Sequence, residues 1–110
     1  VISCLANDVG YSEIFSEQLL VKANVGDLLL VLSGSGNSPN VVKAFETAAE
    51  LNIKTIAITA FDGGKLRQIS DQGIHVPTKD KEYGPAEDAH MILDHLVGYY
   101  LFRKVHNEGY

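Results

Sequence analysis

Apolar residues occur along the chain in two alternating patterns. Short apolar runs predict β-strands over residues 1–6, 28–32, 55–59 and 73–76. Apolar positions three and four residues apart predict helices over residues 11–22, 41–51, 65–70 and 85–104. Within these elements, Cys4 is expected to be a small core residue of the first strand, and Ser12 to cap the first helix. The run from Leu28 to Leu32 is apolar at every position, as in strands that are buried on both faces.

Strands that alternate with helices predict βαβ units and therefore a parallel sheet. We expect one domain over residues 1–110, with an α/β fold in which helices flank the sheet as in a flavodoxin-like three-layer sandwich. Ligands of such sheets bind beyond the carboxyl ends of the strands. This rule selects four segments, which are residues 7–8, 33–38, 59–64 and 77–87.

The most informative of these segments is the loop Ser33-Gly34-Ser35-Gly36-Asn37-Ser38-Pro39. Its two glycines permit a positive φ and let a ligand approach the backbone. Ser38 suits the N-cap of the following helix and Pro39 its first turn. A helix N-terminus attracts phosphate through its N–H groups and dipole, and the three serine hydroxyls can donate to phosphate oxygens. The loop therefore predicts a monophosphate site, with an ordinary polar turn before a capped helix as the alternative.

Other phosphate-binding motifs do not describe this loop. No Gly-Lys-Ser or Gly-Lys-Thr follows it, so it is not a Walker loop, and it lacks the Gly-x-Gly-x-x-Gly pattern of dinucleotide sites. No nucleotide cofactor is therefore expected.

Composition and charge narrow the class of protein further. The chain has 45% hydrophobic and 21% charged residues, which is typical of a folded protein, and a formal net charge of -5 without a basic cluster. A nucleic-acid partner is therefore not expected, because phosphate neutralisation needs clustered Lys and Arg. The longest apolar run, 28–32, is too short to span a bilayer, and we expect no signal peptide. With one cysteine excluding an internal disulfide, we expect a cytoplasmic protein without a membrane partner.

The first residue is a valine in an apolar run, without a preceding methionine. We therefore expect this sequence to be a fragment whose N-terminal part is missing, which would leave a sheet edge or an apolar face exposed.

The loop continued to Asn40 resembles the signature of the sugar isomerase (SIS) domain. Residues 7–11 and 13–16 sharpen the resemblance to phosphoheptose isomerases, which interconvert sedoheptulose 7-phosphate and a heptose phosphate. Residues 55–59, 62–65 and 75–77 also resemble that family, so the similarity covers nearly the whole chain.

The resemblance implies a role for several residues. It implies phosphate contacts from Ser33, Gly34, Ser35 and Ser38, and sugar contacts from Asn7 and Asp8. It also implies a catalytic and zinc-binding histidine at His95, with a substrate and metal contact at Glu87. Zinc and a homo-oligomer, a dimer or a tetramer, are the cofactor and assembly that this family implies.

Two positions depart from the family. The isomerases carry glutamine at the position of Glu87 and often threonine at that of Gly34. They also draw a histidine and a catalytic glutamate from a helix that precedes the first residue of this chain. The metal site and the chemistry therefore depend on residues that the chain has only in part.

Each candidate residue also has a structural interpretation. Glu87 could serve the dipole of the last helix, His95 could be a partly buried helix residue, and Asn7-Asp8 could cap the following helix. Glu87 and His95 lie about 12 Å apart along a helix axis, so both reach one metal only if the helix start bends or both side chains extend, and zinc sites usually need three or four ligands. His75 and His90 are interpreted as structural, His106 as an exposed tail residue, and residues 99–102 as core or subunit packing.

Three hypotheses follow. The first is a phosphosugar isomerase that moves a proton between adjacent carbons through an enediol, with His95 as the proton carrier. The second is a non-catalytic phosphosugar-binding module of a regulator or adaptor. The third is a domain that contributes only an interface to a larger assembly.

Overall fold

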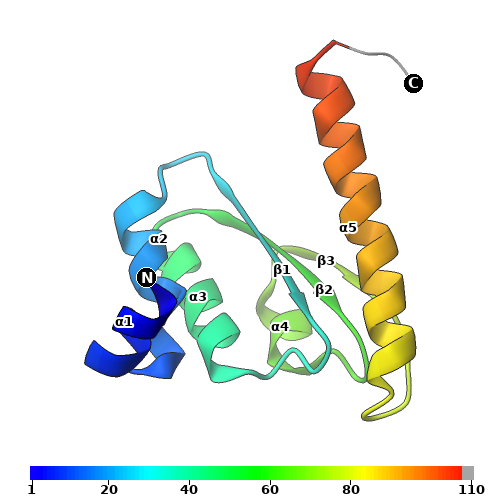
Figure 1. The fold of residues 1–110 in the computed structure, drawn as a ribbon, viewed down its shortest axis with the longest axis horizontal. Coiled ribbons are helices and arrows are strands. Elements are labelled where there is room, and N and C mark those ends of the chain that lie inside the picture. The colour runs from blue at the N-terminus through cyan, green and yellow to red at the C-terminus, as the bar shows by residue number, and fades with distance from the viewer. Residues whose placement is uncertain (108–110) are drawn as a thin grey trace.

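The computed structural model describes residues 1–107, and its centre is a parallel sheet of three strands (Figure 1). The strands are β1 (Leu28–Ser33), β2 (Lys54–Thr59) and β3 (Gln72–His75), in the order β1-β2-β3. Leu28 pairs with Lys54 at one end of the sheet, and Thr59 pairs with both Ser33 and His75 at the other end. The predicted α/β fold with a parallel sheet is confirmed.

Helices lie on both sides of these strands. The crossover helices α3 (Pro39–Glu50) and α4 (Gly64–Ile69) join the strands in chain order. Phe45 of α3, Ala57 of β2 and Leu66 of α4 form a buried core cluster. The long helix α5 (Tyr83–Val105) stands across the strands from α3, and its C-terminal half extends clear of the other elements (Figure 1).

A short polar connection holds the start of β2 to the start of β3. The backbone N–H of Thr55 donates to the Asp71 carboxylate (2.9 Å), and the Asp71 N–H donates back to Thr55 Oγ1 (3.0 Å). The hydrogen bond from the Thr55 backbone lowers the pKa of Asp71, because it stabilises the charged carboxylate.

The N-terminal segment is a helix and not the predicted strand. Helix α1 spans Ile2–Asp8, and the Leu5 N–H donates to the Val1 carbonyl (3.0 Å). A short apolar run fits a helix face and a strand equally well, and here the helical hydrogen bonds form. Cys4 is exposed on this helix and donates through its thiol to Asp8 Oδ2 (3.3 Å), so its prediction as a core residue was wrong.

The helix predicted over residues 11–22 is divided in two. A 3-10 turn, η1 (Tyr11–Glu13), precedes helix α2 (Ser16–Lys22). The buried Ser16 hydroxyl donates to Glu13 Oε2 (2.7 Å) at the break between them. Gly10, with φ of 118°, is the N-cap of η1, so the prediction of Ser12 as the cap was wrong.

Strand β1 lies at an edge of the sheet, and β2 is the central strand. Leu29 and Val31 pack against the core cluster, whereas Leu28 and Leu32 point to the other face and remain 56% and 39% exposed. The expectation that this run is buried on both faces is therefore wrong for the described residues. Over residues 1–107, we find no helix that is both long enough and apolar enough to cross a membrane.

Candidate functional site

Three of the four segments selected from the sequence meet at the carboxyl ends of the strands. Backbone N–H groups of the 60–66 segment donate to the 33–38 loop, from Ala60 to the Gly34 carbonyl (3.0 Å) and from Leu66 to the Gly36 carbonyl (3.0 Å). The Phe61 N–H donates to Thr78 Oγ1 (3.3 Å), which brings the third segment to the same edge. These three segments therefore lie at the edge that the carboxyl-end rule selects, and ligand binding there stays a prediction.

Two serine hydroxyls of the loop accept hydrogen bonds from the loop itself. The Gly36 N–H donates to Ser33 Oγ (3.0 Å), and the Asn37 N–H donates to Ser35 Oγ (3.2 Å). Each hydroxyl that accepts in this way still has its own hydrogen to donate outward. The loop thus presents two oriented donors, which suits a ligand rich in acceptor oxygens.

Ser38 is the N-cap residue of α3, as predicted, and Pro39 is the first residue of the helix. The exposed Ser38 side chain makes no capping hydrogen bond. Its hydroxyl is therefore available to an incoming ligand at the positive end of the helix dipole.

The loop packs closely on the turn before α4. Gly36 has φ of 66°, and a Cβ added there would lie 2.1 Å from the Gly63 carbonyl oxygen. At Gly64, which has φ of 54°, an added Cβ would lie 2.3 Å from the Ser35 carbonyl oxygen. Only glycine permits both the left-handed backbone and this approach.

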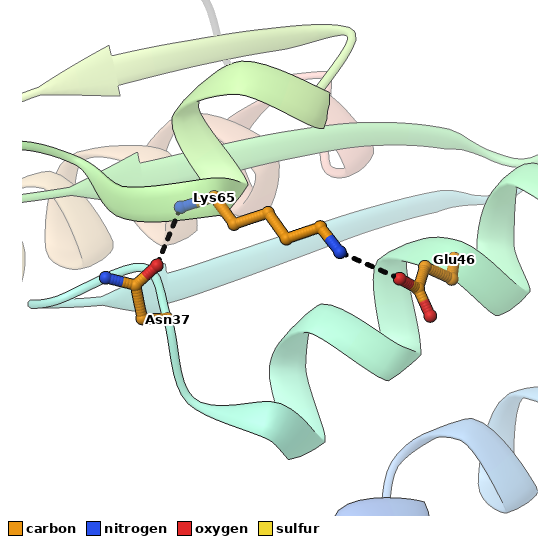
Figure 2. A network of polar contacts seen from close by, with 3 residues as sticks. All are labelled: Asn37, Glu46 and Lys65. Carbon is orange, nitrogen blue, oxygen red and sulfur yellow. Dashed lines mark hydrogen bonds and ion pairs between the residues drawn. The ribbon is translucent and has the colours of Figure 1, made fainter.

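Asn37 connects the loop to α4 through its side chain. Figure 2 shows Asn37 Oδ1 accepting from the Lys65 N–H (2.9 Å), while Lys65 Nζ reaches Glu46 of α3 (3.2 Å). The lysine ammonium is thus directed along α3 and pairs with a carboxylate at the surface. The sequence alone did not predict this contact. Its only signals in the sequence are the asparagine in the loop and the Gly-Gly pair at the start of α4.

A cavity of about 340 Å³ opens beside the loop. Polar side chains and one aromatic ring line it, namely Ser35, Asn37, Phe61, Asp62, Thr78 and Asp80. Its size falls in the range of small-molecule sites. Two carboxylates in the wall suit the hydroxyls of a polyol better than a second phosphate.

An aromatic pair borders the loop at Gly34. The rings of Phe61 and Tyr83 meet edge to face, with centroids 5.1 Å apart. A Cβ at Gly34 would touch the Phe61 ring at 3.6 Å, an ordinary contact distance. Phe61 itself has φ of 52°, a backbone conformation that is unusual for a residue with a side chain and that places its ring at this border.

Asn7 and Asp8 do not follow a strand, in contrast to the expectation. They end helix α1, where Asn7 Nδ2 donates to Asp8 Oδ1 (3.3 Å), and both are exposed. The inference that they lie beyond a strand's carboxyl end was wrong, because the preceding residues belong to helix α1. Their contact with a sugar stays a prediction from the family resemblance.

Glu87 and His95 are exposed on α5. They lie eight residues apart, about 12 Å along the helix axis. Among residues 1–107, we find no group of three or more His, Cys, Asp or Glu side chains that could hold a metal ion. These two residues therefore do not form a zinc site with other residues of the described part of the chain.

The other histidines have structural surroundings. His90 is buried, with Nε2 3.1 Å from the Thr59 carbonyl oxygen, and His75 Nδ1 lies 3.0 Å from Thr59 Oγ1. His106 is exposed, as expected, and stacks on Phe102. Residues 99–102 are exposed as well, so core packing does not account for them within this chain.

The fold and the loop define a class. The family model described as SIS domain matches residues 1–60, and the chain belongs to this family. Its relatives include the phosphoheptose isomerases of Helicobacter pylori strain P12, 38% identical over 96 residues, and of Chlorobaculum parvum, 41% identical over 92 residues. These matches cover 87% and 84% of the chain but 49% and 44% of the relatives.

Solved structures agree with this assignment. The phosphoheptose isomerases of Neisseria gonorrhoeae and Francisella tularensis each superpose with a TM-score of 0.77 at 31% identity over 86% of the chain. The match covers 53% of the first structure and 50% of the second. The predicted resemblance to SIS domains of the phosphoheptose isomerase type is confirmed, and the chain spans about half the length of these relatives.

Proposed function

We propose that the full-length protein is a phosphosugar isomerase that acts on a sugar phosphate such as sedoheptulose 7-phosphate. The observation that carries this proposal is the loop 33–38, whose Ser33 and Ser35 hydroxyls are oriented by loop amides. Together with Ser38 at the N-terminus of α3, they supply three donors to the phosphate. The names of the relatives favour an isomerase over a module that only binds.

The chemistry is a proton transfer between adjacent carbons of the bound sugar. A base removes the proton from the carbon beside the carbonyl while the carbonyl oxygen gains a proton, which gives an enediol. The proton then returns to the former carbonyl carbon while the neighbouring hydroxyl loses its proton and becomes the new carbonyl. We assign His95 as the proton carrier, because imidazole exchanges protons near neutral pH, and we assign Asn7, Asp8 and Glu87 to the sugar hydroxyls. Zinc has no part in this proposal, since Glu87 and His95 do not fit a zinc site on their own.

We further propose that residues 1–110 act as one SIS domain and that the protein is a homo-oligomer. Helix α5 exposes Met91 four residues before His95, Phe102 seven residues after it, and Val105 three residues beyond Phe102. A helix that is apolar on its exposed side is normally covered by another helix. A second copy packed on this side would also shield His95 from water.

The test is conversion of sedoheptulose 7-phosphate to an aldose phosphate by the full-length protein, with and without added zinc. We expect Ser35→Ala and Ser38→Ala each to raise KM about tenfold or more and to leave kcat nearly unchanged, because each removes a charge-assisted hydrogen bond. Ser12→Ala, at an exposed position of η1, is the matched control and should change neither parameter.

His95→Ala separates chemistry from binding. We expect this variant to bind the sugar phosphate with unchanged affinity and to lose turnover. Saturable binding by the wild type without turnover of any ketose or aldose phosphate would contradict the isomerase and would leave a binding module.

A further inference from the structure

His90 connects the first turns of α5 to the sheet. It is only 6% exposed, and its Nε2 lies 3.1 Å from the Thr59 carbonyl oxygen. A carbonyl oxygen can only accept, so Nε2 carries a hydrogen and donates. This contact is a directed hydrogen bond from a buried side chain of α5 to the backbone of the central strand.

The acceptor is a fixed point of the fold. Thr59 is the last residue of β2 and is 1% exposed. Its carbonyl also accepts from the Val76 N–H (2.9 Å), and its hydroxyl contacts His75 Nδ1 (3.0 Å). Because backbone and side chain of Thr59 are both held, the hydrogen bond from His90 fixes α5 to the rigid carboxyl edge of the sheet.

Little else in α5 is buried. Among the described residues of this helix, only Ala86 and His90 are buried. Glu87 precedes His90 by three residues, and His95 follows it by five, about 4.5 Å and 7.5 Å along the axis. A rotation or slide of α5 about this attachment would therefore move both proposed site residues relative to the phosphate loop.

We propose that His90 is a positioning residue for the isomerase reaction. It fixes the rotation of α5 about its axis and its position along that axis relative to the sheet. His95 can then contact the carbon chain of a sugar whose phosphate is bound at the loop 33–38. His90 does not touch the substrate in this proposal and acts through His95. The inference rests on the proposed function, and it adds a role to a histidine that the proposed chemistry does not use.

Two substitutions of nearly equal polarity test the hydrogen bond. In H90Q the side-chain amide reaches as far as Nε2 of histidine and can donate to the Thr59 carbonyl. In H90N the amide is one carbon shorter and does not reach. We expect H90Q to keep kcat within about threefold of the wild type and H90N to lose up to about 10²-fold, the effect of a small misplacement of a reacting group.

The substrate affinity and a control variant separate positioning from general loss of structure. KM should stay within about threefold of the wild type in both variants, because the phosphate loop lies between β1 and α3 and not on α5. Ile14→Val, which trims a buried side chain beside η1, is the control for mild destabilisation and should leave kcat unchanged. Amide hydrogen exchange should rise in residues 86–93 of H90N and remain at the wild-type rate in H90Q.

The outcomes distinguish this inference from the function on which it rests. Equal kcat for H90N and H90Q, or unchanged exchange in α5 of H90N, overturns the positioning role while wild-type turnover keeps the isomerase. A wild type that binds without turnover refutes the isomerase and the positioning role together.

Discussion

Gly36→Ala places a methyl group where the structure has no room for one. The added Cβ would lie 2.1 Å from the Gly63 carbonyl oxygen, and ordinary contact begins at 3.4 Å, so the two atoms must separate by 1.3 Å. Such a shift would break the hydrogen bond from the Leu66 N–H to the Gly36 carbonyl. The substitution therefore tests whether the close approach of the loop to the turn before α4 maintains the phosphate site.

The cost has three physical sources. An alanine at φ of 66° loses about 1–2 kcal/mol relative to glycine. Steric overpacking adds about 1–3 kcal/mol, and a lost hydrogen bond about 0.5–1.5 kcal/mol. Because the shift that relieves the overlap also breaks the hydrogen bond, these terms are not additive, and we expect a total of about 2–4 kcal/mol.

Gly34→Ala is the matched control within the same loop. There the added Cβ would meet the Phe61 ring at 3.6 Å and the Tyr83 ring at 3.8 Å, which are ordinary contacts. We expect this variant to differ from the wild type by less than about 0.5 kcal/mol.

The assay is urea unfolding of the full-length protein, followed by circular dichroism, with and without sedoheptulose 7-phosphate. Saturating ligand at about 100 times Kd should stabilise the wild type and Gly34→Ala by about 2.7 kcal/mol, and Gly36→Ala by much less. A Gly36→Ala variant as stable and as responsive to ligand as Gly34→Ala would refute the argument from the close approach.

Three further predictions concern stability and assembly. The pKa of Asp71 lies below its ordinary value because the Thr55 N–H stabilises the carboxylate, so its contribution to stability is present above about pH 4 and is lost below it. The difference in urea midpoint between the wild type and Asp71→Asn should therefore shrink as the pH falls from about 6 to about 3. Asn37→Ala should cost about 0.5–1.5 kcal/mol in the same assay, more than Lys65→Met, which removes an exposed ion pair. Phe102→Glu should shift the sedimentation of the full-length protein to a smaller species, and an unchanged profile would exclude self-association through this part of α5.

The sequence predicted the elements whose local signals agree with their surroundings. Helices α3, α4 and α5 begin within one or two residues of their expected starts, because Ser-Pro, Gly-Gly and Pro signals mark these boundaries. The loop 33–38 was predictable for the same reason, since its serines and glycines have local roles that a sequence displays.

Contacts between distant residues could not be predicted in this way. Residues 1–6 satisfy both helical and strand patterns, and only the formed hydrogen bonds decide between them. The partial exposure of β1 depends on its place at the edge of the sheet, which an apolar run does not encode. The same holds for His90, because its partner Thr59 lies 31 residues away in the chain.

The two halves of the candidate site are held in different ways, and this difference should govern how each responds to change. Five hydrogen bonds hold the phosphate loop, within itself and to the 60–66 segment. Glu87 and His95 instead lie on a helix that is buried only at Ala86 and His90 among its described residues. Phosphate affinity should therefore survive most changes outside the loop, whereas turnover should depend on whatever fixes α5. We therefore expect substitutions in the C-terminal half of α5 to lower kcat before they raise KM. Substitutions in the loop 33–38 should raise KM before they lower kcat.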